Sequence, residues 1–171
     1  MIALMDYENA CRIARWKYEG IYSFYSLDGS SECINELLNG TYYHVTDETE
    51  GLLGYFCYGR SAQVPAGDNV GAYSDCSLTD IGLGMRPDLC GNGRGLEFLN
   101  CGLKFGSEWL GAGKYRLTVA AFNLRAIRVY EKAGFRMQMS FISQSDAGDT
   151  EFITMVRPDV IVDENYDLFS M

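Results

Sequence analysis

Hydrophobic residues at helical spacing predict one long buried helix in the second half of the chain. A strand is expected next, over residues 114–122, where apolar residues occupy both faces as a central strand requires. A short helix then begins at Asn123, a typical N-cap residue, and ends at Gly134. The apolar stripe of the long helix consists of Leu96, Leu99, Leu103 and Leu110, with Phe98, Phe105 and Trp109 beside it.

Alternating apolar and polar residues predict strands around these helices. Phe135, Met137, Met139 and Phe141 alternate with polar residues, which indicates a half-exposed strand that turns back into a last strand. The other patterns predict strands over 1–4, 41–48, 51–59, 76–85 and 151–157, helices over 6–18 and 30–40, and a glycine-rich loop over 59–75. This order predicts a mixed α/β fold, α+β-like, with one sheet flanked by helices.

Length and composition favour one globular domain. With 171 residues, 47% of them hydrophobic, we expect a single domain over 1–171 whose last residues, 157–171, form an acidic tail. No apolar stretch approaches the roughly 20 residues of a membrane span. The N-terminus reaches acidic residues too early for a signal peptide, so we expect a cytoplasmic protein with no membrane partner.

The cysteines and the single histidine limit the possible chemistry. None of the six cysteines forms a C-x-x-C pair, and without a secretion signal a disulfide framework is not expected. His44 is the only histidine and lies in a strand-like segment, where a histidine is usually a packing or a surface residue. A histidine-based nucleophile or metal site would need that one residue, and we predict no metal site.

The charge is strongly acidic but unevenly distributed. A net charge of −9 disfavours nucleic acid as a partner. Between Arg86 and Arg136, nine Lys and Arg residues accompany four acidic residues, so this segment carries +5 and the rest of the chain −14. Either the charges vary by chance, or the basic segment faces an anion while the acidic remainder favours a cationic partner.

Three glycines lie inside the basic segment, in the sequence CGNGRGLEFL at residues 90–99. Glycines directly before a helix let backbone N–H groups converge on a phosphate. The spacing G-x-G-x-G departs from the dinucleotide motif G-x-G-x-x-G, and no G-K-[ST] follows as a triphosphate-binding loop requires. The loop alone therefore leaves two alternatives: the pyrophosphate of coenzyme A, or a turn that binds nothing.

Two longer stretches together resemble the GNAT superfamily of acyl-CoA-dependent N-acetyltransferases. The stretch MRPDLCGNGRGLEFL is similar to that family's pyrophosphate signature, Arg/Gln-x-x-Gly-x-Gly/Ala. The stretch LTVAAFNLRAIRVYEKAGF is similar to its strand–Asn–helix signature. The resemblance covers nearly the whole chain and is strongest from Asp80 to Phe135. It implies the GNAT acyl-CoA N-acyltransferase fold, a splayed mixed sheet flanked by helices.

The resemblance also implies where coenzyme A binds and what assists acyl transfer. The cofactor would enter a gap between the strand that ends at Met85 and the strand over 117–122. A backbone N–H near Met85 would stabilise the oxyanion, and Tyr130, which otherwise reads as a packing residue, would protonate the leaving thiolate. The implied acetyl-CoA contacts are Leu83, Gly84, Met85, Cys90, Gly91, Asn92, Gly93, Arg94, Gly95, Leu96, Asn123, Ala126, Tyr130 and Lys132.

Two positions depart from the family pattern. Cys90 stands where the family usually has an arginine or glutamine that helps hold the phosphates, and we expect Arg94 or Asn92 to supply the missing contact. Many members place a glutamate on the strand before the glycine loop, where this chain offers Thr79 and Asp80. Asp80 is the candidate general base, although strand alternation turns it to the other face, and an ordered water chain is the alternative.

We therefore expect an N-acetyltransferase that moves an acetyl group from acetyl-CoA to a primary amine by direct attack in a ternary complex. The alternative is a non-catalytic acyl-CoA-binding sensor or partner module. The acidic remainder favours a cationic acceptor: a polyamine, an aminoglycoside-like molecule or a peptide amine. Most of Trp16, Tyr18, Tyr22, Phe24 and Tyr25 are expected in the core, with one or two lining the acceptor pocket. The protein is expected to be a monomer or a homodimer.

Overall fold

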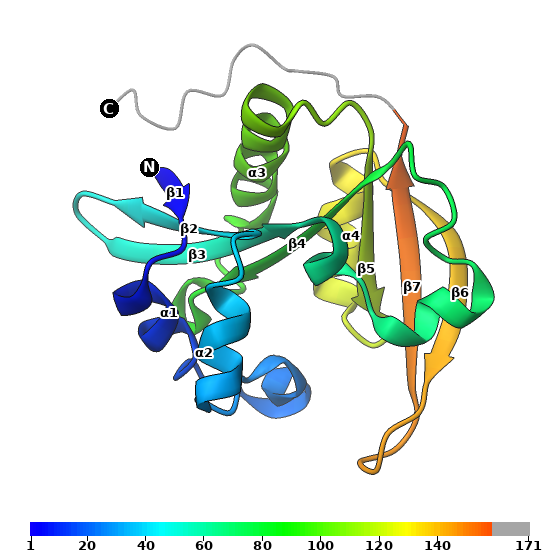
Figure 1. Ribbon diagram of the computed structural model, residues 1–171, viewed down its shortest axis with the longest axis horizontal. Helices are drawn as coiled ribbons and strands as arrows, with labels where there is room; N and C mark the ends of the chain where they lie inside the picture. The colour runs from blue at the N-terminus through cyan, green and yellow to red at the C-terminus, as the bar shows by residue number, and fades with distance from the viewer. Residues whose placement is uncertain (159–171) are drawn as a thin grey trace.

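The computed structural model describes residues 1–158 and contains one seven-stranded mixed sheet flanked by helices (Figure 1). The strand order is β1-β2-β3-β4-β5-β7-β6. The strands are β1 (Ile2–Leu4), β2 (Tyr42–Asp47), β3 (Gly51–Tyr58), β4 (Thr79–Met85), β5 (Tyr115–Ala120), β6 (Arg136–Ser143) and β7 (Thr150–Arg157). The helices are α1 (Tyr7–Ile13), α2 (Ser31–Leu37), α3 (Gly95–Leu110) and α4 (Leu124–Lys132). The predicted mixed α/β fold and its order of elements are confirmed.

The sheet has different layers on its two faces, because alternate residues of its strands point to opposite sides. Phe56 of β3 belongs to a core cluster that contains Leu99 and Leu103 of α3. The next residue, Cys57, belongs to a cluster with Ala10 and Ile13 of α1 and Leu37 of α2. A third cluster joins β5, β6 and β7 to the segment after the 3₁₀-helix η3 (Pro65–Val70).

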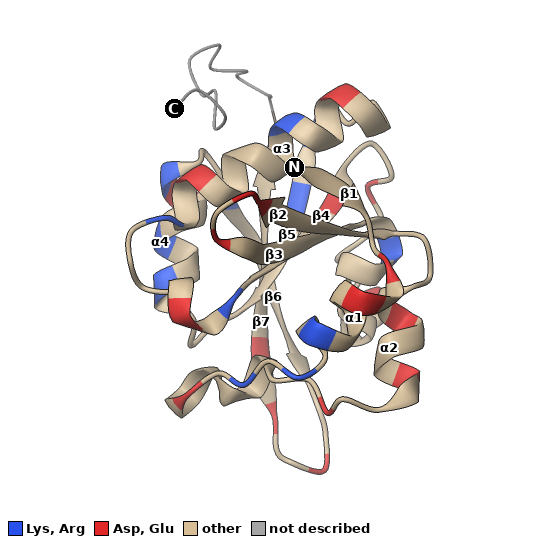
Figure 2. Cartoon of the chain, turned by 90° about the vertical axis from the view of Figure 1, so that its left-hand side faces the viewer, with Lys and Arg blue, Asp and Glu red and all other residues tan. Residues whose placement is uncertain are grey.

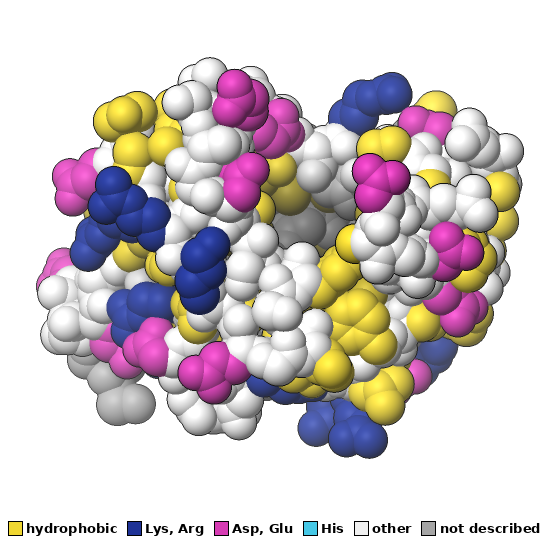
Figure 3. All heavy atoms as spheres, turned by 90° about the horizontal axis from the view of Figure 1, so that it is seen from below, with side chains coloured by type: hydrophobic (Ala, Val, Ile, Leu, Met, Phe, Trp, Pro, Cys, Tyr) yellow, Lys and Arg dark blue, Asp and Glu magenta, His cyan; other side chains and the backbone are white. Residues whose placement is uncertain are grey.

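The sheet consists of two halves that separate at its centre. β4 and β5 are parallel and pair only at two positions, Thr79 with Tyr115 and Asp80 with Arg116. β4 continues five residues further, to Met85, without a partner on that side. Seen from below, the surface is hollowed between two lobes, and acidic side chains border the hollow on both sides (Figure 3). The splayed sheet therefore creates a cleft between the halves.

Local sequence signals set most helix ends where they were predicted. Asp6 caps α1 by accepting a hydrogen bond from the Asn9 N–H, and Asn123 caps α4 by accepting one from the Ala126 N–H. Gly134, just beyond α4, has a φ of 91°, a conformation that favours glycine. The lone histidine, His44, is buried in β2 with its Nε2 3.3 Å from Asp6 Oδ2, so of the two expected positions, packed or on the surface, it takes the packed one.

Several predicted boundaries and buried positions were wrong. The first helix ends at Ile13 rather than at residue 18, because the following residues cross to the cleft. Trp109 and Leu110 are exposed, since α3 projects beyond the sheet at its C-terminal end (Figure 1). Met137 is exposed because the β6–β7 register shifts between Met137 and Met139, which breaks the alternation.

Other predicted elements differ in extent. The second helix ends at Leu37 rather than at residue 40, and the strand predicted from residue 76 begins at Thr79. The loop predicted over 59–75 contains two 3₁₀-helices, η2 (Gly59–Ala62) and η3. Arg157, which was predicted both to end the last strand and to begin the acidic tail, is the last residue of β7, and residues 159–171 lie outside the described part of the chain.

Candidate active site

The end of β4 presents to the cleft backbone groups that have no strand partner. Arg86 N–H donates to Leu53 C=O of β3 at 2.8 Å, so these two residues form a hydrogen-bonded pair. In an antiparallel ladder such pairs alternate with pairs that are not bonded to each other. The next pair, Gly54 with Met85, is therefore a non-bonded one, and so is Phe56 with Leu83. The N–H and C=O groups of Leu83 and Met85 thus point away from β3, into the gap toward β5.

The side chains of β4 line the two faces of the cleft unequally. Leu83 and Met85 pack against the core cluster that contains α3, as does Leu96 in the first turn of α3. On the other face, a Cβ on Gly84 would lie 2.4 Å from the Tyr55 ring. Tyr55 can therefore cover β4 only because position 84 is a glycine.

A short segment crosses the mouth of the cleft from the N-terminal half. It comprises Tyr18 and the 3₁₀-helix η1 (Gly20–Tyr25). The Tyr18 hydroxyl donates to the Met85 C=O at 2.7 Å, and Asn123 Nδ2 donates to the Tyr25 hydroxyl at 3.2 Å. Burial raises the pKa of both phenols, that of Tyr18 well above its ordinary range, so both remain protonated at neutral pH. The segment joins the end of β4 to the start of α4.

The glycine loop lies between the 3₁₀-helix η4 (Pro87–Leu89) and α3. Gly91 and Gly93 have φ angles of 82° and 80°, which other residues rarely adopt. Gly95 begins α3 and packs against α4, where an added Cβ would lie 3.2 Å from Val129. The loop therefore places backbone N–H groups directly before a sixteen-residue helix, an arrangement suited to an anion.

The polar side chains of the loop are engaged by other groups of the protein. Arg94 Nη1 and Nη2 donate to the two carboxylate oxygens of Glu50 at 3.0 and 2.8 Å. Asn92 Nδ2 donates to the Asp88 C=O at 3.1 Å. Both residues expected to compensate for Cys90 thus hold the loop to its neighbours.

The Cys90 thiol is half-buried at the start of the loop. Its Sγ lies 3.6 Å from the carbonyl oxygens of Met85 and Arg86. Burial raises the pKa of this thiol, and the nearby Arg125 charge only partly opposes that effect. The thiol is therefore protonated at neutral pH, which does not suit a nucleophile.

The predicted α4 residues lie at helical spacing on one face. Asn123, Ala126 and Tyr130 recur at three- and four-residue intervals, and the Tyr130 ring is buried near Tyr25. Burial raises the pKa of the Tyr130 phenol well above 10.0, so it holds its proton at neutral pH. Lys132 is exposed in the last turn of α4. Asn123, Tyr25 and Tyr130 gather at one end of the cleft.

Asp80 occupies a different environment from the one its predicted role as base requires. Arg116 Nε and Nη2 donate to its two carboxylate oxygens at 2.7 and 2.8 Å, and Gln63 Nε2 donates to Oδ2 at 2.8 Å. Asp80 is 3% exposed and Arg116 1%. A carboxylate with both oxygens occupied in a closed site cannot reach an incoming amine. Asp80 thus forms a buried ion pair with Arg116 at the point where β4 and β5 stop pairing.

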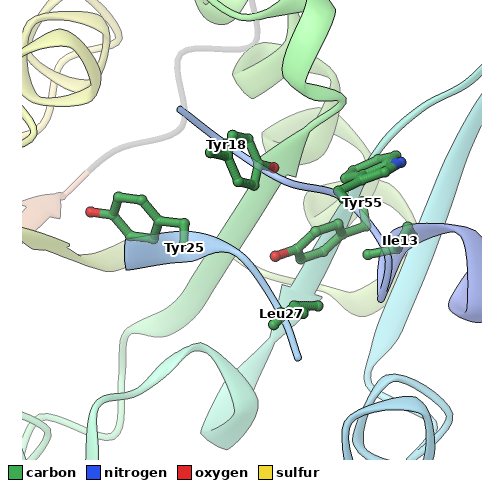
Figure 4. Close-up of a pocket in the computed structure, with 6 residues that line it drawn as sticks. Ile13, Tyr18, Tyr25, Leu27 and Tyr55 are labelled. Atoms are coloured by element: carbon green, nitrogen blue, oxygen red, sulfur yellow. The ribbon is translucent and has the colours of Figure 1, made fainter. Parts of the chain in front are cut away.

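Two adjoining spaces lie on the side of the sheet that faces α1 and α2. The inner space is closely lined by side chains and leaves no room for a water molecule (Figure 4). Its lining residues are Ile13, Trp16, Tyr18, Tyr25, Leu27 and Tyr55. The outer one is a groove of about 430 Å³ that shares Leu27 and Tyr55 with the inner space. Its polar and acidic lining includes Ser26, Ser30, Asp28, Glu32 and Glu36. Acidic positions recur on α2 while basic positions gather on α4 (Figure 2).

Sequence reasoning missed the contacts that Tyr18 and Arg125 make at the cleft. Tyr18 was expected among core or pocket aromatics, and its contact with Met85 spans 67 residues of sequence. Arg125 lies with its guanidinium carbon 4.1 Å from the centre of the Tyr22 ring. The available signal was a basic residue in the first turn of a helix, where the helix dipole disfavours positive charge.

Comparison with known proteins shows which family the sequence resembles over most of its length. The sequence model of the acetyltransferase (GNAT) family matches residues 2–135. No curated protein matches the chain significantly. Within residues 1–158, no helix is long and apolar enough to cross a membrane.

Solved structures with the same fold include acetyltransferases of different sources. A GNAT-family acetyltransferase from Bacillus anthracis has a TM-score of 0.68 at 14% identity, covering 91% of this chain and 92% of that one. A chimera based on the spermidine N-acetyltransferase SpeG from Vibrio cholerae has a TM-score of 0.66 at 17% identity, covering 91% and 94%. At these identities the similarity shows the fold.

Proposed function

The chain belongs to the acetyltransferase (GNAT) family, and from this premise we propose that it transfers an acetyl group from acetyl-CoA to a primary amine. The transfer is direct, with both substrates bound in a ternary complex. The observation that carries this proposal is the pair of residues Leu83 and Met85, whose backbone groups face the cleft without a strand partner. They lie directly before a glycine loop that opens a long helix.

The residues around the cleft fit coenzyme A. The amides of a pantetheine arm can pair with the backbone groups of Leu83 and Met85 that lack a strand partner, as an added strand would. The N–H groups of the Gly91–Gly95 loop and the N-terminus of α3 suit the pyrophosphate. The Tyr18 hydroxyl, which occupies the Met85 C=O, must shift if the arm takes that carbonyl.

Three groups of the chain support the chemistry of acyl transfer. The Met85 N–H, which points away from β3 into the cleft, would stabilise the negative charge that the thioester oxygen gains as the amine nitrogen attacks. The Tyr130 phenol gives its proton to the thiolate as the carbon–sulfur bond breaks. The amine loses its proton through ordered water, because Asp80 is closed off by Arg116 and Gln63.

The acceptor is a cationic amine that enters through the outer groove. Asp28, Glu32 and Glu36 line that groove, and the chain outside the basic segment carries a charge of −14. The SpeG proteins with the same fold are named for spermidine, an amine with several positive charges. An acceptor with a second cation would place it in the acidic groove while the reacting amine approaches Met85.

The test is release of free thiol from acetyl-CoA in the presence of a panel of amines: polyamines, aminoglycosides, lysine and peptides. We expect turnover with cationic amines and none with a neutral amine of similar size. Binding of acetyl-CoA with no thiol release across the whole panel would support the acyl-CoA sensor instead. Absence of acetyl-CoA binding would refute both.

A further inference from the structure

One basic side chain, Arg125, lies next to the glycine loop and forms no ion pair with a carboxylate of residues 1–158. A Cβ added to Gly91 would lie 3.5 Å from Arg125 Nη1, so this guanidinium is next to the start of the loop. Arg125 also influences the Cys90 thiol and the Tyr18 phenol, which border the same end of the cleft. Its side chain is exposed, and among residues 1–158 it forms no ion pair.

The other arginines near the loop are already occupied. Arg86 donates to both carboxylate oxygens of Asp88 and to the carbonyls of Glu50 and Leu52. Arg94 is held in a two-bond pair by Glu50. Of the three arginines around the loop, Arg125 is the one whose charge is not neutralised within hydrogen-bond distance.

The Tyr22 ring fixes the position of Arg125. The guanidinium carbon lies 4.1 Å from the ring centre, the geometry of a cation–π contact. Arg125 occupies the first turn of α4, which contains no acidic residue, and a positive charge there is disfavoured by the helix dipole. An anion bound between the loop and α4 would reverse that penalty, because it would face both the helix N-terminus and the guanidinium.

We propose that Arg125, held in place by Tyr22, makes the pyrophosphate contact that Cys90 cannot make. This inference rests on the proposed binding of coenzyme A, and it adds the residue that replaces the usual side chain at position 90. Tyr22 is a positioning residue, since it acts through Arg125. Because Tyr22 belongs to η1, the same contact joins the acceptor-side segment to the phosphate site.

The first experiment compares Arg125→Ala with Arg128→Ala, which removes the same charge from an exposed position on the same helix. Affinities for coenzyme A and for 3′-dephospho-coenzyme A are measured by calorimetry, and for pantetheine by NMR titration. Arg125→Ala is expected to weaken both nucleotide ligands about tenfold, the effect of losing one charge-assisted hydrogen bond, and to leave pantetheine binding unchanged. Arg128→Ala should change each affinity less than about twofold.

The second experiment asks whether the two positions are interchangeable. Adding Cys90→Arg to Arg125→Ala should restore coenzyme A affinity to within about threefold of the unaltered protein. Tyr22→Leu should weaken binding about threefold when Arg125 is present and have no effect in the Arg125→Ala background. Thermal unfolding of each variant checks that the fold is retained.

Four outcomes overturn the inference. The first is that Arg125→Ala and Arg128→Ala bind coenzyme A with equal affinity, and the second is that Arg125→Ala weakens pantetheine binding as much as coenzyme A binding. The third is that adding Cys90→Arg to Arg125→Ala does not restore coenzyme A affinity. The fourth is that Tyr22→Leu still weakens binding in the Arg125→Ala background. Each leaves the proposed function standing as long as the unaltered protein binds coenzyme A. Failure of the unaltered protein to bind it is instead a failure of the proposed function.

Discussion

The buried pair of Asp80 and Arg116 offers the sharpest test of what holds the cleft open. Asp80→Asn keeps the size of the side chain but removes its charge, leaving the Arg116 guanidinium buried without a counter-charge. Removing one partner of a buried pair costs about 3–5 kcal/mol. We expect the lower end, about 3 kcal/mol, because the amide oxygen still accepts a hydrogen bond and Arg116 also donates to the Asp75 C=O at 3.4 Å.

Urea unfolding followed by circular dichroism measures this loss. With a dependence of about 2 kcal/mol per molar urea, the midpoint should fall by about 1.5 M. The double variant Asp80→Leu/Arg116→Met removes both charges and should recover most of the loss, since apolar pairs of similar volume replace buried ion pairs well. Below the transition, Asp80→Asn should retain turnover within about threefold of the unaltered protein. An unchanged midpoint with a hundredfold loss of turnover would show that Asp80 is the general base after all.

Three further predictions concern the cofactor and the chemistry. Gly93→Asp places a side chain at a φ of 80° and a negative charge among the phosphate-facing N–H groups, so it should abolish the rise in melting temperature that acetyl-CoA produces; binding as tight as that of the unaltered protein would refute the loop assignment. Cys90→Ser should remain active, because the thiol is protonated, and its inactivation would indicate a covalent acyl-cysteine. Tyr130→Phe should lower turnover by roughly 10²–10⁴-fold with little change in coenzyme A affinity. Since burial raises the Tyr130 pKa well above 10.0, the phenol loses no proton as pH rises to 9, and the rate of the unaltered enzyme should increase over that range as the amine deprotonates; a fall before pH 9 would contradict this assignment.

Sequence patterns predicted what depends on neighbours along the chain. The N-caps at Asp6 and Asn123 and the stop at Gly134 are local hydrogen-bond and backbone preferences, so they were recognisable from residue type and spacing. The alternation in β6 failed at Met137 because a register shift, caused by pairing with β7, inserts one residue. That shift has no signature in β6 itself.

The parts of the site that escaped prediction depend on contacts between distant segments. Asp80 and Arg116 are each the one charged residue of their strand, which was a usable signal for a buried pair once the strands were known to be parallel neighbours. Strand alternation also indicated that the Asp80 side chain points to the face opposite the one where the family's base is expected. The Tyr22–Arg125 contact and the pairing of Arg94 with Glu50 are set by tertiary packing. The sequence therefore indicated Arg94, rather than Arg125, as the side chain that makes the phosphate contact missing at Cys90.

The alternating free edge of β4 has a consequence for amide hydrogen exchange. An interior strand ordinarily protects all its amides, but in β4 only Gly82 and Gly84 belong to the hydrogen-bonded pairs with β3. Leu83 and Met85, between and beyond them, have amides directed at the cleft. Deuterium uptake over residues 82–85, where β4 has no partner in β5, should therefore alternate between slow and fast from one residue to the next. A ligand that adds a strand in the gap would slow the fast amides alone, so exchange at these two residues would report occupancy of the cleft without any turnover.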